Sequence, residues 1–187
     1  MILLDVLKTF AAMPNRQGVL KAFDKAASGS KFPAYPALRN QIEALPTPVV
    51  LPEITDFIFG LDAETINDHI RNIKDVFMMV EYGVFQGNSL FDVRNRDVDF
   101  LLTIFIGKTN QGRNLHIIEH TMLMDELLTY VQRMLQHIEQ TDRDRCGATR
   151  YMDGAVTILP IQPLILLNCH GWEVSFKKKA NDLFFYE

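Results

Sequence analysis

The segment His116-Ile117-Ile118-Glu119-His120 is the sharpest chemical pattern in the chain. It has the H-x-x-E-H spacing of zinc hydrolases, in which two histidines one helical turn apart bind zinc and the glutamate activates water. Zinc also needs a third protein ligand, and the spacing ties no other residue, Glu173 included, to the motif. We therefore interpret His116 and His120 as packing residues at a sheet margin. A small zinc-dependent hydrolase using His116, Glu119 and His120 remains the alternative.

Two further patterns are weaker as catalytic sites. Cys169 and His170 are adjacent, so on a strand they point to opposite faces and cannot act as nucleophile and base. The segment Gly107-Lys108-Thr109 is similar to the end of a phosphate-binding loop, but the upstream glycine is missing. We predict no catalytic residue, no resident metal and no cofactor, and hence a protein that is not an enzyme.

The composition favours one main domain in a reducing compartment. The chain has 187 residues, 48% of them hydrophobic, which is enough for a sizeable core. A net charge of −4 without a long basic block argues against sequence-specific nucleic-acid binding and against a polybasic membrane anchor. Two cysteines are too few for a disulfide scaffold, and charge or proline interrupts every apolar run. We expect a cytoplasmic protein that does not bind membranes.

The first part of the chain reads as an amino-terminal arm, residues 1–45. Leu3 to Ala11 has helical spacing and stops before Pro14, and a second short amphipathic helix is indicated between Val19 and Phe23. Prolines and small residues predict an extended connector over Ser28–Pro36, followed by helical turns over Leu38–Leu45.

The remaining residues, 46–187, read as an α+β core domain. We predict an edge strand or a pair of extended pieces within 47–59, a helix over Asp62–Asp75, and a long antiparallel hairpin of Val76–Phe85 with Val98–Ile106. A loop over Gly107–Asn114 should precede the clearest helix, Leu115–Gln140. Its apolar stripe is expected to pack on the sheet and comprises Ile117, Met124, Leu127, Leu128, Val131, Met134 and Ile138.

The last strands are expected within Gly147–Ile161, Ile165–Cys169 and Trp172–Lys177. Alternation through Trp172, Val174 and Phe176 predicts one buried face. The lysines at 177–179 suit a solvated strand end. The fold class predicted is α+β, with an antiparallel sheet and a long hairpin packed by amphipathic helices.

Exposed or extended aromatic residues are candidates for an oligomer interface. The terminal Phe184, Phe185 and Tyr186 would be sticky if left exposed, so they should dock on their own domain or on a neighbouring subunit. The proline-rich connector offers the same two alternatives. The further candidates are Phe32 and Tyr35 in the connector and Phe85 and Phe91 in the hairpin.

From Pro46 to Lys179, the order of elements and the final strand Gly171-Trp172-Glu173-Val174-Ser175-Phe176-Lys177 resemble the tail-terminator and head-to-tail joining proteins of tailed bacteriophages and prophages. The resemblance implies a ring of identical copies, often six, that caps the tail tube and meets the neck. It implies no catalytic residues. The partners would be the chain itself and phage tail-tube or neck proteins, in the bacterial cytoplasm during assembly and then in the virion.

Residues 1–45 have no counterpart in the smaller proteins of that family. They could wrap a partner or enlarge the core. A monomeric adaptor domain is the third interpretation of the whole chain.

Overall fold

The structure is a computed structural model. It describes residues 2–24, 30–45, 49–60, 70, 73–87, 98–109, 115–143, 152, 154–161 and 169–179. The structural statements below concern these residues.

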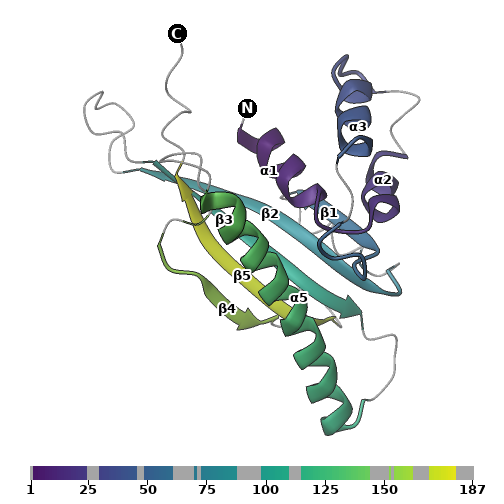
Figure 1. The fold of residues 1–187 in the computed structure, drawn as a ribbon, viewed down its shortest axis with the longest axis vertical. Coiled ribbons are helices and arrows are strands. Elements are labelled where there is room, and N and C mark those ends of the chain that lie inside the picture. The colour runs from purple at the N-terminus through teal and green to yellow at the C-terminus, as the bar shows by residue number, and fades with distance from the viewer. Residues whose placement is uncertain are drawn as a thin grey trace.

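Five strands form one sheet in the order β1-β2-β3-β5-β4 (Figure 1). Their bounds are β1 Asp56–Gly60, β2 Val76–Gly87, β3 Val98–Thr109, β4 Thr157–Pro160 and β5 Cys169–Lys179. Strands β2 to β5 pair antiparallel, whereas β1 pairs parallel to β2. The prediction of an antiparallel sheet is therefore wrong for β1. The segment between β1 and β2 is long enough for the crossover that a parallel neighbour requires.

The predicted pairing of the two long central strands is confirmed. β2 and β3 run from Val76 opposite Lys108 to Gly87 opposite Val98, with a register shift between Tyr82 and Phe85. The turn of the predicted hairpin lies in 88–97, outside the described residues. β3 continues to Thr109, so the loop predicted to begin at residue 107 begins later, because β5 pairs with β3 along this whole stretch.

Glycine permits the close approach of β3 and β5. A Cβ atom on Gly171 would lie 2.2 Å from the carbonyl oxygen of Ile106, which no side chain can occupy. The two strands therefore meet here at a separation that only glycine allows.

Four helices are described: α1 Ile2–Ala11, α2 Arg16–Asp24, α3 Tyr35–Glu43 and α5 Ile117–Arg143. The bounds of α1, α2 and α5 agree with those of the predicted helices to within a few residues. The extended connector predicted through Pro36 is wrong at its end, because α3 begins at Tyr35. Pro36 fits the first helical turn, where its missing N–H is not needed.

Helix α5 is longer than predicted at its carboxyl end. The predicted helix ends at Gln140, but the helix continues to Arg143. Asp142 is buried, and its Oδ2 accepts a hydrogen bond from the backbone N–H of Met152 at 2.9 Å. This bond allows a carboxylate to lie on the buried side of the last helical turn.

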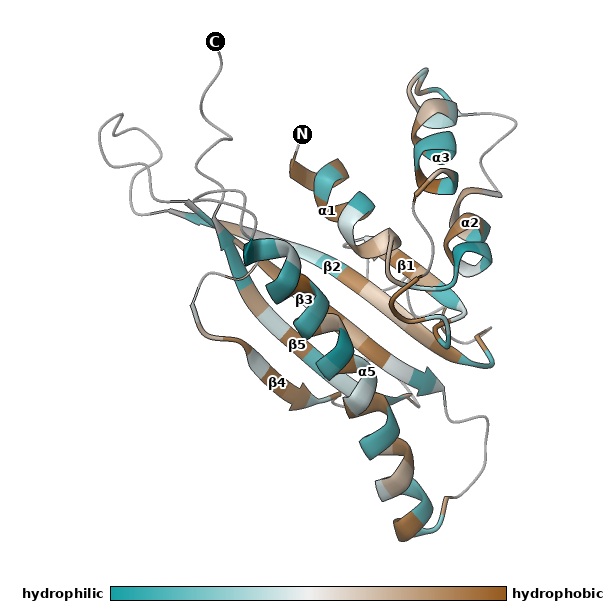
Figure 2. Cartoon of the chain, in the orientation of Figure 1, coloured by the Kyte–Doolittle hydropathy of each residue, from teal (hydrophilic) through white to brown (hydrophobic). Residues whose placement is uncertain are grey.

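The main core lies between the sheet and α1, α2 and α5. Figure 1 shows α1 and α5 on one face of the sheet, and Figure 2 shows mostly hydrophilic residues on the outward side of α5 where it crosses the sheet. Phe10 of α1 and Phe23 of α2 belong to this core together with Val131 of α5 and Phe176 of β5. The described helices of residues 1–45 thus enlarge the core, which is one of the two roles expected for them.

The opposite face of the sheet carries a second, smaller apolar cluster. Phe77 and Met79 of β2 point into it, while Met78 and Val80 point into the main core. Cys169 belongs to the smaller cluster, and burial raises the pKa of its thiol to about 11. β2 is therefore apolar on both faces along its first half.

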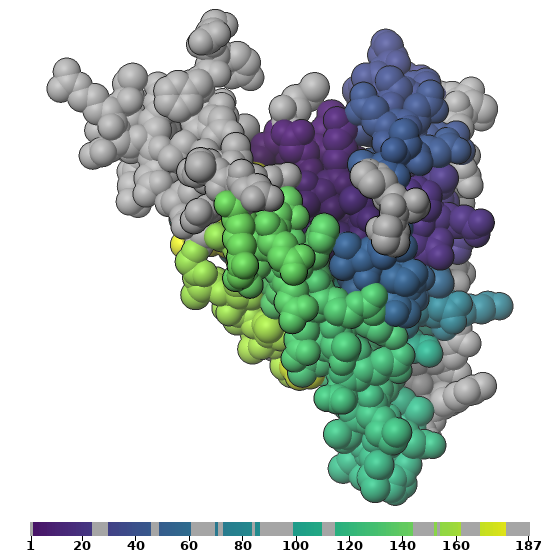
Figure 3. All heavy atoms as spheres, viewed as in Figure 1, coloured from purple at the N-terminus to yellow at the C-terminus, as the bar shows by residue number. Residues whose placement is uncertain are grey.

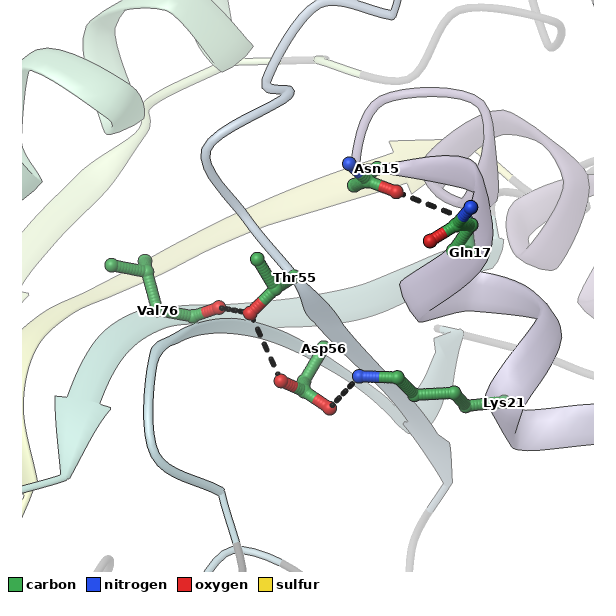
Figure 4. Close-up of polar contacts among 6 residues, drawn as sticks. All are labelled: Asn15, Gln17, Lys21, Thr55, Asp56 and Val76. Atoms are coloured by element: carbon green, nitrogen blue, oxygen red, sulfur yellow. Dashed lines mark hydrogen bonds and ion pairs between the residues drawn. The ribbon is translucent and has the colours of Figure 1, made fainter.

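The contact between α2 and β1 depends on Gly18. A Cβ atom there would lie 2.0 Å from the carbonyl oxygen of Thr55, so the helix can approach the strand only with glycine at this position. Figure 4 shows the polar contacts around this junction. Asn15 caps α2 by accepting a hydrogen bond from the N–H of Gln17 at 3.0 Å, and Lys21 pairs with Asp56 at 3.3 Å.

Some predictions lie outside the described residues. They are the greater part of the helix Asp62–Asp75, most of the strand Ile165–Cys169, and the tail Asn181–Glu187. Within the described part of the chain, none of the helices combines the length and the apolarity needed to cross a membrane.

Candidate interaction surface at the start of helix α5

The amino-terminal end of α5 carries three large apolar side chains that are exposed. Ile117 is 74% exposed, Ile118 63% and Met122 67%. At 100° per residue they lie within one side of the helix. Figures 1 and 3 show this end of α5 projecting past the sheet at the bottom of the view. We call Ile117, Ile118 and Met122 the α5 tip surface.

Ile117 was predicted on the buried stripe, and this prediction is wrong. Leu127, Val131, Met134 and Ile138 of the same stripe are buried. The start of α5 projects past the end of the sheet in Figure 1, so Ile117 keeps the helical phase of the stripe but is not covered by a strand.

The H-x-x-E-H motif supplies the amino-terminal cap of α5. Nδ1 of His116 accepts a hydrogen bond from the N–H of Ile118 at 3.4 Å, and Oε2 of Glu119 accepts one from the N–H of His116 at 2.9 Å. This reciprocal pattern is a capping box. His116 is exposed, so packing at a sheet margin does not describe it.

His120 points to a different partner. Its Nε2 lies 3.1 Å from Nδ1 of His170 on β5, and the two rings meet edge to face with centroids 4.6 Å apart. One turn later, the indole N–H of Trp172 donates to the carbonyl oxygen of Met124 at 2.8 Å. These two contacts fix the amino-terminal half of α5 to β5.

The motif residues therefore do not converge on one point. His116 and Glu119 bind the start of their own helix, and His120 contacts β5. In the described part of the chain no group of three His, Cys, Asp or Glu side chains is placed to share a metal ion. Cys169 and His170 lie on opposite faces of β5, as predicted.

A second exposed apolar region lies on the edge strand β4. Ile158 and Leu159 are both exposed, one on each side of the strand. The N–H of Ile161 donates to the carbonyl of Gly171 at 2.9 Å, so by alternation Ile158 and Pro160 turn their backbone groups away from β5. Pro160 has no N–H to offer there, which is where an edge strand tolerates proline.

The predicted interface aromatics have different surroundings. Phe32 is exposed. The hydroxyl of Tyr35 donates to the carbonyl of Phe23 at 2.8 Å, so Tyr35 packs on its own domain. Phe85 is partly exposed and stacks on Phe100 with ring centroids 4.5 Å apart. Outside the described residues lie Phe91, Phe184, Phe185 and Tyr186.

A polar row crosses the sheet face opposite the helices. Glu81, Thr103 and Ser175 stand in register on three neighbouring strands, with 3.3 Å between the hydroxyl oxygens of Thr103 and Ser175. Ser175 also donates to Glu173 at 3.4 Å. Burial and the charge of Glu173 raise the pKa of the Glu81 carboxyl. This part of the face is therefore polar and acidic.

The lysines at the end of β5 are only partly solvated. Lys177 is exposed and pairs with Asp99 at 3.5 Å, as expected for a strand end. Lys178 is only 5% exposed, which contradicts the prediction. It lies opposite Phe100, and the alternation of the strand turns it toward the helices.

Sequence reasoning missed the two exposed apolar regions and the contact between the two histidines, for different reasons. Ile118 and Met122 lie off the predicted apolar stripe of their helix, and large apolar residues in that position are a sequence signal for an exposed apolar surface. The contact between His120 and His170 joins residues far apart in the sequence, so spacing could not reveal it.

Comparison with known proteins gives no family model that matches this chain, no matching curated protein and no matching solved structure.

Proposed function

We propose that the chain is a structural subunit that assembles with copies of itself into a ring, at the tail end or head-to-tail junction of a tailed phage or prophage. The α5 tip surface is the observation that carries the proposal. Three large apolar side chains in the first two turns of one helix, each more than 60% exposed, are costly to leave in water.

A ring requires two different surfaces on each copy. In a head-to-tail contact, one patch of a subunit meets another patch of the next, and the contact repeats until the ring closes. The α5 tip surface and the exposed residues of β4 lie on separate elements. They supply two such surfaces, although Pro160 prevents continuous strand addition along β4.

The phage assignment is supported by residues 46–179, whose order of elements and final strand resemble those of phage tail-terminator and head-to-tail joining proteins. The ring would contain several copies, often six in that family, and would contact tail-tube or neck proteins. The zinc-dependent hydrolase is not carried further, because the residues of its motif bind separate partners.

The test is absolute molar mass by light scattering across a concentration series, with electron microscopy of any discrete species. We expect a ring-sized oligomer for the wild-type chain. A double variant, Ile117→Asp with Met122→Asp, should shift it to monomer, because two charges cannot be buried in an apolar contact without partners.

Gln136→Asp is the control, since Gln136 is exposed on the same helix but lies outside both surfaces. It should leave the oligomer unchanged. A wild-type chain that stays monomeric at every concentration would favour the monomeric adaptor. An oligomer that survives in the double variant would exclude the α5 tip surface as the contact.

A further inference from the structure

We propose that the contact between His120 and His170 is a proton-sensitive latch, which holds the first two turns of α5 on β5 while His170 is neutral and releases them when His170 takes up a proton. The latch does not depend on the proposed ring, because it concerns how one chain holds its own helix. It determines the position of the α5 tip surface, which lies within the same two turns.

The geometry of the contact requires that one of the two facing nitrogens carries no proton. Nε2 of His120 and Nδ1 of His170 lie 3.1 Å apart, so one nitrogen donates and the other accepts. A charged imidazole has an N–H at both nitrogens. When both rings are charged, two N–H groups face each other and repulsion replaces the hydrogen bond.

The two histidines differ in how they tolerate a charge. His120 can take up a proton and still donate through Nε2 to Nδ1 of His170. On His170, Nε2 is buried and finds no hydrogen-bond partner among the described residues. Charging His170 would put part of the positive charge on that atom, which costs more than leaving a neutral polar atom there. The docked helix therefore favours a neutral His170.

The pKa of His170 follows from the same surroundings. Burial and the neighbouring His120 lower this pKa. In the released state the ring returns toward the ordinary histidine pKa of about 6.5. Because the docked state binds fewer protons, docking is fully stable above a pH of about 6.5 and weakens as the pH falls below that value.

The charged groups on the neighbouring elements do not reverse this direction. On β3, Lys108 stands opposite His170 in register, where a cation disfavours a further positive charge. On α5, His116 and Glu119 are bound at the start of the helix. On β5, Glu173 is in register with a residue of the smaller apolar cluster and so lies on the opposite face of the sheet. β4 carries no titratable side chain.

The contact made by Trp172 limits how much of α5 is released. Its indole N–H donates to the carbonyl oxygen of Met124 at 2.8 Å, directly after the two turns that the histidine pair holds. From Leu127 onward one side of the helix is buried. Release therefore concerns residues 117–123 and leaves the rest of α5 in place.

The experiment is amide hydrogen exchange of the full wild-type chain at pH 7.5 and pH 5.5, with exchange times scaled for the effect of pH on chemical exchange. We expect the protection of residues 117–123 to fall about three- to tenfold at pH 5.5, because an exposed imidazole is roughly ten times more often charged than neutral at that pH. Residues 127–138 of the same helix are the internal control and should keep their protection.

Variants identify the group that titrates. His170→Asn keeps an acceptor oxygen near the position of Nδ1 but cannot be charged, so its exchange should not change with pH. His116→Asn and His137→Asn are matched controls and should retain the wild-type change. His137 lies further along the same helix, and His116 belongs to its cap.

A second measurement does not depend on how the variants fold. In nuclear magnetic resonance of the wild-type chain, the imidazole nitrogens of His170 should change their chemical shifts over the same pH range as the exchange of residues 117–123. The latch is excluded if the protection of this segment is the same at both pH values, or if His170→Asn retains the pH dependence. Molar mass by light scattering tests the ring separately.

Discussion

Glu81 lies near the middle of β2, on the sheet face opposite the helices, beside Thr103 of the next strand. Its raised pKa means that the folded chain holds the proton of this carboxyl more tightly than the unfolded chain. The associated stability is fully present at acid pH, below the unfolded pKa of about 4.3, and is lost as pH rises through the folded pKa. At neutral pH the ionised Glu81 therefore destabilises the fold.

We predict that Glu81→Gln increases the free energy of unfolding at pH 7 by several tenths of a kcal/mol, roughly the scale of surface substitutions. The gain should shrink toward pH 4, where the wild-type carboxyl takes up its proton. Urea denaturation at the two pH values measures this. Asp125→Asn, at an exposed position on α5, serves as the control. A loss of stability at pH 7 would contradict the prediction.

At the scale of elements, the start of α5 depends on its capping box. Glu119→Ala removes the acceptor for the N–H of His116 and should lower the free energy of unfolding by about 0.5–2 kcal/mol. Glu119→Gln should retain most of the stability, because glutamine makes the same reciprocal bond. Thermal denaturation and amide exchange over residues 117–120 measure both variants.

The same pair of variants separates the cap from a catalytic glutamate. A zinc hydrolase needs the carboxylate of Glu119, so it would lose its activity equally with Gln and with Ala. An alanine variant as stable as the wild type would show that the cap contributes nothing to the fold.

Periodicity explains which elements could be predicted. α1, α5, β2, β3 and the end of β5 carry clear helical or alternating patterns, and these elements are present where expected. The parallel pairing of β1 could not be predicted, because a short apolar strand does not encode the direction of its neighbour. The exposure of Ile117 depends on where the sheet ends, which is a property of the assembled fold.

At the scale of the whole molecule, Arg16 joins three helices. Its guanidinium donates to the carbonyl oxygens of Ile42 at 2.8 Å, Ala11 at 3.4 Å and Leu45 at 3.4 Å. These acceptors lie at the ends of α1 and α3, while Arg16 itself begins α2. One side chain thus holds the amino-terminal helices together beside the sheet.

We predict that Arg16→Ala lowers the free energy of unfolding by about 1–3 kcal/mol, because buried carbonyls lose a charged donor. Arg16→Lys should recover only part of the loss, since one ammonium cannot span all three acceptors. Urea denaturation gives the magnitude, and faster amide exchange in α3 locates it. Arg143→Ala, at an exposed site, is the control. Equal effects of Arg16→Ala and Arg143→Ala would refute this role.

The order of strands in the sheet has a consequence for synthesis of the chain. β3 is central in the finished sheet, yet its second neighbour, β5, follows it only after all of α5 and β4. While the ribosome is still making those elements, the nascent β2–β3 pair presents the open side of β3, with its N–H and C=O groups exposed beside Leu102, Ile104 and Ile106. Unpaired edges of this kind recruit other chains. The interval between translation of β3 and of β5 is therefore the period in which this protein is most exposed to aggregation.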